Sequence, residues 1–478
     1  MTAPAATLPL QPDKVRTPLA ELLFLAAPTV AQMASYTVMQ FCDALQLSVG
    51  AGDVAATAAG MAGFMAFTGM AWAFGALMVV NTLVSQSLGA GNREACGRHL
   101  WQGIWLAVLI GLLLVPTRFV SAPLFALFGH SPELVAQEKA YYDVQVLATP
   151  VRLATLATGQ FLLAIGRPNI TLLAAAVSAV VNIGLNHLLI NGHLGFPRMG
   201  VAGAAWATNA AVCVEFGILA LFAWSRAIRA QFHSGNWRLN VPAMRLLVRL
   251  GIPAGIQTVS EVFAWFLFSV WIMNAFGQAA VAANNYMFQY MKVSFMPAFG
   301  ISAAVTALVG RYLGAGRLDL ARQRAHLGFK VTLVYMLVCG TVFFLGRYAL
   351  IGVFSDNAEV IRIGATLLVF ASIFQLFDGL YVIYIGALRG AGDTTVPAWV
   401  TAGLCWTITV GGGYLAARHM PWLGVSGPWV MASLYGVILG TYLSLRFARG
   451  DWKAIDQGHP TPAPSNALPA STTIAAST

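Results

Sequence analysis

The sequence predicts an all-α integral membrane protein, with twelve transmembrane helices arranged as two parallel six-helix repeats around a central cleft. Three observations predict this fold. Of the 478 residues, 58% are hydrophobic and only 9% are charged, whereas an ordinary soluble globule carries about 25% charged residues. Apolar stretches long enough to cross the ~30 Å hydrocarbon core as helices recur along the chain. The third observation is an internal repeat at a constant offset of 225 residues.

Each predicted span is an apolar stretch near or above the ~20 residues that a membrane helix needs. None shows the alternation of apolar and polar residues that a membrane β-barrel requires, so the spans are expected to be helices. In chain order, they are residues 18–44, 54–84, 100–120, 141–165, 169–191, 200–224, 247–276, 280–310, 327–353, 360–388, 395–417 and 423–447.

The two ends of the chain differ in composition from the rest. Residues 1–17 and 451–478 are rich in Pro, Ala, Ser and Thr and hold few bulky apolar side chains, which predicts disordered tails. Between them we expect an N-terminal lobe (18–225), a cytoplasmic linker (226–244) and a C-terminal lobe (245–450). The five cysteines show no metal-ligand spacing, so they are interpreted as small apolar fillers, and no structural metal is expected.

The basic residues predict the orientation, because Lys and Arg concentrate in short cytoplasmic loops. Placing both termini in the cytoplasm puts 19 of the 27 Lys and Arg residues on that side and seven outside, with Lys292 inside a span. The net charge of +10 then reflects this topology and attraction to anionic lipid. It is poor evidence for nucleic-acid binding, and no nucleic-acid partner is expected.

The internal repeat relates the first six spans to the last six. Without gaps, residues 28–103 share 18 of 76 positions with the segment 225 residues later, including Pro28 with Pro253 and Gln32 with Gln257. Six spans per copy is an even number, so both copies enter the membrane in the same direction. Parallel copies are related by an axis along the membrane normal, with a cleft between them. This architecture is typical of secondary transporters.

Two carboxylates stand among apolar neighbours within predicted spans. Glu261 lies in span seven and Asp378 in span ten, although an Asp within a membrane helix costs at least ~2.5 kcal/mol to insert. Counting 1.5 Å per residue from Arg249 and Arg389, Glu261 lies ~18 Å and Asp378 ~16 Å from the cytoplasmic face. Acids at one depth favour a proton or cation site. The alternative is a pair of protonated, hydrogen-bonded core acids.

The N-terminal half holds a different polar set. Asp43 ends span one, Asn182 and Asn186 are spaced i, i+4 on one face of span five, and Thr208 lies in span six. A carboxylate surrounded by amide and hydroxyl oxygens suits a hard cation or a proton-switchable network. The alternative is that the Asn and Thr side chains only join helices by hydrogen bonds.

At these residues the sequence resembles the multidrug and toxic compound extrusion (MATE) family, and within it the NorM-like branch, over residues 18–450. The resemblance rests on FCD in span one, LGAGN after span two and LGAG after span eight, NIGLN and GVAGAAWAT in spans five and six, and FDGLYVIYIGALRGAGDTTVP from span ten onward. It implies antiport, in which sodium or protons enter while amphipathic, often cationic, organic compounds leave. It also implies a C-lobe ion site at the two span acids and an N-lobe site at the Asp/Asn/Thr set. NorM-like members often carry Tyr where this chain has Phe374, one turn before the span-ten acid.

Three further ionisable residues fall within predicted spans: Arg152, Glu215 and Lys292. For Arg152 and Glu215 an ion pair with a neighbouring helix is expected. Lys292 lies about 10 Å farther toward the outside than Glu261. Either its ammonium reaches the C-lobe acids, which would displace sodium and favour proton coupling, or it faces an outer aqueous cleft.

The sequence therefore predicts a monomeric, multi-pass protein of the cytoplasmic (inner) membrane that exports small amphipathic, often cationic, organic compounds or drugs in exchange for Na⁺ or H⁺. No cofactor besides that ion is expected. The alternative is a lipid-linked or glycan flippase, which usually carries several cationic residues in its cleft. An enzyme is not expected, because no HxxxH or HExxH pattern occurs. The residues predicted to line the substrate cleft are Tyr36, Gln257, Phe263, Trp265, Met287, Lys292 and Phe374.

Overall fold

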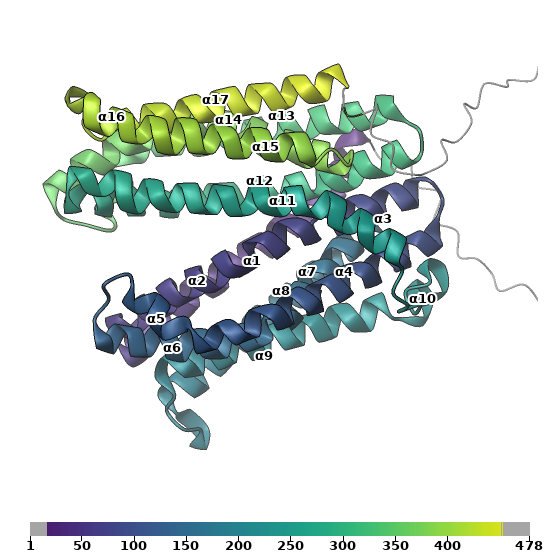
Figure 1. The fold of residues 1–478 in the computed structure, drawn as a ribbon, viewed down its shortest axis with the longest axis horizontal. Helices are drawn as coiled ribbons and strands as arrows, with labels where there is room; N and C mark the ends of the chain where they lie inside the picture. Colours follow the sequence, from purple (N-terminus) through teal and green to yellow (C-terminus); the bar gives the residue numbers. More distant parts are fainter. Residues whose placement is uncertain (1–16, 451, 453–478) are drawn as a thin grey trace, which may run out of the picture.

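The computed structural model describes residues 17–450 and 452, and these form helices joined by short connections (Figure 1). The predicted tails fall almost entirely outside the described residues. Twelve helical segments are long and apolar enough to cross a membrane. Each coincides with one predicted span, so the all-α fold with twelve spans is confirmed.

The first half contains α1 to α9, followed by the short α10. Span two consists of α2 and α3, and span four of α6 and α7. The bounds are α1 (Pro18–Ala51), α2 (Asp53–Leu77), α3 (Val79–Gly89), α4 (Arg93–Leu114), α5 (Ser121–Ala126), α6 (Pro132–Gln145), α7 (Thr149–Ala164), α8 (Pro168–Asn191), α9 (Gly200–Ala223) and α10 (Arg226–Phe232).

The second half contains α11 to α17. Span seven continues from α11 through a π-helical turn, and span eleven joins α15 to α16 through another. The bounds are α11 (Val241–Leu267), α12 (Gln278–Gly314), α13 (Leu318–Gly352), α14 (Ala358–Gly390), α15 (Thr395–Leu404), α16 (Gly413–His419) and α17 (Ser426–Arg449). The predicted linker (226–244) contains α10, but α11 begins at Val241, inside the last residues of that linker.

Several helices extend beyond the predicted apolar stretches. Span four begins at Pro132 rather than at residue 141, because Ser131 caps the helix and proline occupies its first turn. Span nine begins at Leu318 rather than at residue 327. Hydropathy detects only the part of a helix that is apolar enough for lipid, so polar helical extensions are missed.

The helices form two lobes that lie against each other at one end and diverge at the other (Figure 1). The lobes meet at the end that carries α3 and α10, which we call the α10 end. They diverge toward the end that carries α5 and α16, which we call the α5 end. Helix α1 packs against α12, α2 packs against α11, and α3 packs against α12. The first helix of each repeat, α1 or α11, therefore lies at the boundary between the lobes.

Two glycines of the LGAG turns allow the lobes to approach closely at the α10 end. A Cβ on Gly89 would lie 1.9 Å from the backbone oxygen of Arg311, and one on Gly314 would lie 2.0 Å from that of Gln86. These residues correspond in pairs at the 225-residue offset, so α3 and α12 cross at equivalent positions of the two repeats. Backbone contact at this distance excludes any larger residue.

Polar side chains of α3 add hydrogen bonds across the same boundary. Thr82 donates to the backbone oxygen of Arg389 at 2.9 Å, and Gln86 donates to that of Gly390 at 2.8 Å. Both side chains are buried. Because these bonds join the two lobes directly, separation of the lobes at the α10 end would break them.

Candidate ion and substrate sites

The two predicted C-lobe carboxylates lie in one polar cluster. Asp378 of α14 is buried, and its charge interacts with that of Glu261 on α11. Tyr381, one turn after Asp378, donates a hydrogen bond to Glu261, and Tyr435 of α17 donates to the same oxygen at 3.4 Å. Gln257 donates to the Tyr381 hydroxyl at 3.1 Å. The structure thus brings together acids from helices far apart in the sequence.

No basic side chain neutralises these acids by contact. Among the described residues, the ion pairs within 4.0 Å involve neither Glu261 nor Asp378. Two interacting carboxylates, one of which accepts from tyrosine hydroxyls, can hold a proton or a monovalent cation when no basic side chain contacts them. The ion-binding role of the pair stays a prediction.

Lys292 does not reach the C-lobe acids. Its side chain is exposed on α12, and within the described part of the chain it forms no ion pair. The hypothesis that its ammonium contacts the acids is therefore wrong for this structure. Competition between Lys292 and sodium gives no reason to prefer proton coupling.

The predicted N-lobe set also forms one hydrogen-bonded chain. Asn186 donates to the Asp43 carboxylate and, at 3.3 Å, to the side-chain oxygen of Asn182. Asn182 in turn donates to the Thr208 hydroxyl at 3.3 Å. Both asparagines are fully buried, whereas Asp43 is half-buried. The i, i+4 spacing on α8 places both amides on the face that meets α1 and α9.

Several predicted cleft residues lie inside the C-lobe instead. Met287 and Phe374 are buried in its apolar core, and Trp265 packs beside them, with its ring 5.8 Å from that of Phe374. Trp265 also lies 6.5 Å from the ring of Tyr435, so this core borders the acid cluster. The prediction that these three residues line a cleft between the lobes is therefore wrong. Hydropathy does not specify which way a helix is rotated, so it could not show which side chains face the cleft.

Gln257 and Tyr36, two more predicted cleft residues, belong to the polar clusters. Gln257 is 3% exposed and bonds to Tyr381, as described above. Tyr36 lies on α1 and donates to the buried Glu215 of α9. The sequence alone did not indicate that Tyr36, Tyr381 and Tyr435 donate hydrogen bonds to glutamates. The position of Tyr381 three residues after Asp378, on the same helical face, was the one available signal.

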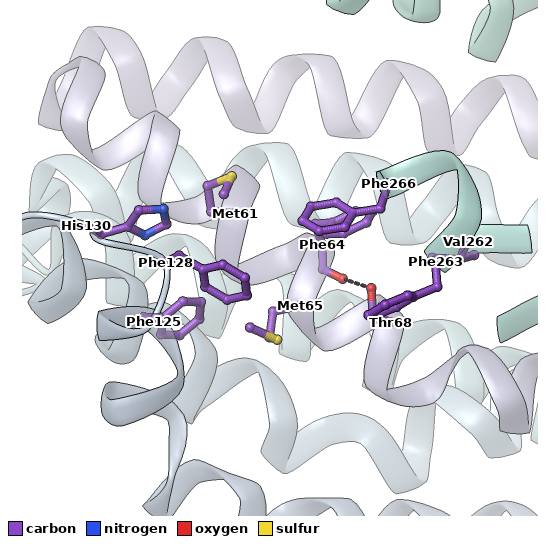
Figure 2. A pocket seen from close by; sticks show the side chains of 10 residues that line it. All are labelled: Met61, Phe64, Met65, Thr68, Phe125, Phe128, His130, Val262, Phe263 and Phe266. Carbon is purple, nitrogen blue, oxygen red and sulfur yellow. Dashed lines mark hydrogen bonds between the residues drawn. The ribbon is translucent and has the colours of Figure 1, made fainter. Parts of the chain in front are cut away.

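A small apolar pocket lies between the lobes, and Phe263 lines it (Figure 2). Its ≈80 Å³ volume is well below the about 300–1,000 Å³ of a drug-sized site. It can therefore hold one ring or alkyl group of a larger compound. The other lining residues come from α2, from α5 and the segment that follows it, and from α11: Met61, Phe64, Met65, Thr68, Phe125, Phe128, His130, Val262 and Phe266.

One aromatic contact of this pocket joins the lobes. Phe64 of α2 and Phe266 of α11 stack with ring centroids 5.4 Å apart (Figure 2). Phe263 is 44% exposed, and its ring lies 6.3 Å from that of Phe266. Exposed aromatic rings can pack against apolar groups of many shapes and can contact an organic cation through their faces.

A known protein family matches each half of the chain separately. The family model described as MatE matches residues 28–188 and again residues 253–415. The chain belongs to the MatE family. The two matches begin 225 residues apart, at the offset of the internal repeat. The predicted resemblance to the MATE family is thereby confirmed, and the NorM and PmpM relatives described next confirm its NorM-like branch.

Relatives of this MatE protein include named resistance proteins. The probable multidrug resistance protein NorM of Pseudomonas putida is 32% identical over 415 residues, which cover 83% of this chain and 89% of the relative. The multidrug resistance protein PmpM of Pseudomonas aeruginosa is 31% identical over 423 residues, which cover 87% of each chain.

Solved structures share the fold of this MatE protein at low sequence identity. A MOP superfamily transporter from Pyrococcus furiosus matches with a TM-score of 0.83 and 20% identity, over 92% of this chain and 98% of its own. A eukaryotic MATE transporter matches with a TM-score of 0.82 and 20% identity, over 91% and 96%. These likenesses support the two-lobed, twelve-span fold.

Proposed function

We propose that this protein is a cation-coupled antiporter that exports amphipathic, often cationic, organic compounds in exchange for Na⁺ or H⁺. The observation that carries the proposal is the C-lobe cluster, in which Glu261 and Asp378 interact while no basic side chain pairs with either. The names of the relatives, NorM and PmpM multidrug resistance proteins, support drug export. Buried acids within membrane helices mark ion and proton pathways by default.

The N-lobe chain from Asp43 to Thr208 is proposed as a second ion site. It supplies a carboxylate, two amide oxygens and a hydroxyl within one hydrogen-bonded set. Oxygen ligands of this kind suit a hard cation, and the carboxylate alone suits a proton. Both lobes then carry an ion-responsive site that includes the first helix of its repeat.

Transport follows from a shift between two arrangements of the lobes. The contacts at Gly89 and Gly314 close the α10 end, which we orient toward the cytoplasm together with both chain termini. Rocking of the lobes would open this end and close the α5 end. Coupling requires that the ion and the organic cation favour different arrangements, because a ligand with equal affinity for both shifts nothing.

The substrate class follows from the charge and shape of the sites. The acids attract cations, and the small pocket between the lobes, with its exposed Phe263, accepts an apolar ring or alkyl group. A flippase for anionic lipid-linked cargo needs cationic side chains in the cleft instead. We place the protein in the cytoplasmic membrane as a monomer surrounded by lipid.

Efflux of ethidium from cells of a pump-deleted strain, measured with and without sodium, tests the proposal. Glu261→Gln and Asp378→Asn are each expected to insert normally but to lower ion-driven efflux by about tenfold or more, because the neutral side chain no longer exchanges an ion. Glu359→Gln is the matched control, since Glu359 is exposed near the start of α14. It should retain the wild-type rate.

Reconstituted vesicles decide between the possible outcomes. Ethidium transport at the wild-type rate by either acid variant would remove that acid from the coupling site. Movement of a labelled anionic lipid without ethidium transport would instead identify a flippase. Dependence on a sodium gradient or on a pH gradient identifies the coupling ion.

A further inference from the structure

Glu215 is a buried glutamate of the N-lobe that takes no part in the proposed ion sites. It lies eight residues before the end of α9, so about 12 Å inside the helix, and it is 4% exposed. Tyr36 of α1 donates a hydrogen bond to its carboxylate. Ser178 of α8 faces the same carboxylate, but its hydroxyl hydrogen is donated to the backbone oxygen of Ala211 at 2.9 Å.

The surroundings of Glu215 repeat those of Glu261 in the other lobe. In the N-lobe, Gln32 donates to the Tyr36 hydroxyl at 3.0 Å, and that hydroxyl donates to Glu215. In the C-lobe, Gln257 donates to the Tyr381 hydroxyl at 3.1 Å, and that hydroxyl donates to Glu261. The two glutamines correspond at the 225-residue offset. The same order of amide, phenol and carboxylate therefore occurs once in each lobe.

Arg152 of α7 is the one basic group whose charge interacts with Glu215 among the described residues. It does not form a contact ion pair, because no Arg152 nitrogen lies within 4.0 Å of a carboxylate in the described part of the chain. With its amide oxygen turned toward α7, Gln145 accepts hydrogen bonds from Nη1 and Nη2 of Arg152 at 3.1 and 3.3 Å. The Arg152 Nε is buried without a described partner. Glu215 is thus oriented by Tyr36 and not neutralised by contact.

We propose that Glu215 is a further coupling carboxylate, a proton-binding site in the N-lobe that is separate from the Asp43 site. The proton adds to a carboxylate oxygen of Glu215 and leaves as H⁺, so no other co-reactant is needed. When Glu215 is neutral, its O–H donates to the Tyr36 oxygen, which has a second lone pair for Gln32. The step changes the contact between α1 and α9.

The chemistry of the site selects a proton over sodium. A hard cation takes about six oxygen ligands, whereas this site offers one carboxylate, the Tyr36 hydroxyl and the Ser178 hydroxyl. The Arg152 guanidinium would also repel a second cation. The charged or titratable groups that face Glu215 from the packed helices are Tyr36 of α1 and Arg152 of α7, the latter flanked by Tyr141 of α6.

Proton release upon substrate binding tests the inference, which rests on the proposed antiport. Purified full-length protein is mixed with tetraphenylphosphonium in weakly buffered solution containing a pH-indicator dye, over a range of starting pH. If ion and substrate favour different states, substrate binding must release bound protons. Glu215→Gln is expected to release about one proton fewer per protein at the pH of maximal release. Cys213→Ala, an exposed position on the same helix, should match the wild type.

A second variant covers the case in which Glu215→Gln does not fold. Tyr36→Phe keeps the carboxylate but removes its hydroxyl donor, which favours the protonated form. The amount of proton released should remain, while the pH of maximal release moves higher. Superimposable profiles of Tyr36→Phe and wild type overturn the inference. Full proton release by Glu215→Gln also overturns the inference. If this variant in addition melts at a lower temperature, Glu215 is a structural partner of Arg152 and not a proton site.

The two proposals fail in different ways. If Glu261→Gln releases fewer protons than the wild type while Glu215→Gln releases as many, the proposed antiport stands and Glu215 is not one of its proton sites. Release that falls in Glu215→Gln but is unchanged in Glu261→Gln and Asp378→Asn supports the N-lobe proton site and removes the C-lobe assignment. A wild-type protein that binds tetraphenylphosphonium without releasing protons at any pH overturns the Glu215 inference, while sodium-driven export remains open.

Discussion

An ion pair at the α10 end is expected to hold the two lobes together. Glu21 of α1 accepts hydrogen bonds from Arg324 of α13 at 2.7 Å and from Tyr312 of α12 at 2.7 and 2.8 Å. The side chains of Arg324 and Glu21 are 7% and 21% exposed. Leu22 and Leu25, which follow on α1, pack into a core cluster formed mostly by C-lobe residues. Glu21→Gln removes the charge while keeping the shape.

The cost of this substitution can be estimated from the geometry. Removing one partner of a buried ion pair costs about 3–5 kcal/mol, because the other charge is left uncompensated. The pair is partly exposed, and a Gln oxygen still accepts from Arg324, so we expect about 2 kcal/mol. Arg324 regains water when the lobes separate, so the cost falls on the closed arrangement alone. The equilibrium should then shift roughly 30-fold toward separation at this end.

Pulsed electron paramagnetic resonance measures this shift as a distance distribution. Spin labels are attached at Ala227→Cys on α10 and Leu318→Cys on α13, both exposed positions, after the native cysteines are replaced. Glu21→Gln should increase the population of long distances. Glu94→Gln is the matched control, since Glu94 forms an exposed pair with Arg98 at 3.9 Å within one lobe. Identical distributions for Glu21→Gln and wild type, or an equal shift in the control, would refute the reasoning.

Two further substitutions test the contacts between the lobes. Gly314→Ala should separate α3 from α12 and lower both the melting temperature and transport, because its Cβ would lie 2.0 Å from a backbone oxygen. The control, Gly60→Ala, has open space around it and should be neutral or slightly stabilising. An unchanged melting temperature of Gly314→Ala would argue against the close crossing of the two helices. Phe266→Ala should weaken export of ethidium several-fold, because the ring that stacks on Phe64 is lost. The control is Phe222→Ala on α9, an exposed residue outside the pocket lining. Equal losses of export in the two variants would exclude a specific role for the pocket.

The features that the membrane dictates could be predicted from the sequence. In lipid, a continuous apolar stretch satisfies its backbone hydrogen bonds as a helix of set length, so the apolar stretches located all twelve spans. Counting residues along a span gives depth, which placed Glu261 and Asp378 at one level. The i, i+4 spacing of Asn182 and Asn186 gave their common face. Each of these inferences uses only position along a single helix.

The features that were missed depend on how helices rotate and which ones become neighbours. Met287 and Phe374 lie in the C-lobe core rather than between the lobes, and Lys292 is exposed, with no ion pair to either acid among the described residues. A helix that is apolar on all sides carries almost no signal for its rotation. The phenol donors Tyr36 and Tyr435 contact glutamates more than 170 residues away. Such pairs depend on tertiary packing that hydropathy does not encode.

The duplicated halves keep one chemical arrangement while exchanging the helices that carry it. At the repeat offset, Tyr36 of α1 corresponds to Glu261 of α11, so the position that supplies the phenol in one lobe supplies the carboxylate in the other. The partner comes from α9 in the N-lobe and from α14 in the C-lobe. A tyrosine and a glutamate can exchange places because a hydrogen bond needs only one donor and one acceptor. In both lobes one member lies on the first helix of the repeat, and that helix packs against the opposite lobe. A change of charge at either glutamate would therefore act directly on a helix at the boundary between the lobes, where the proposed alternating access requires movement.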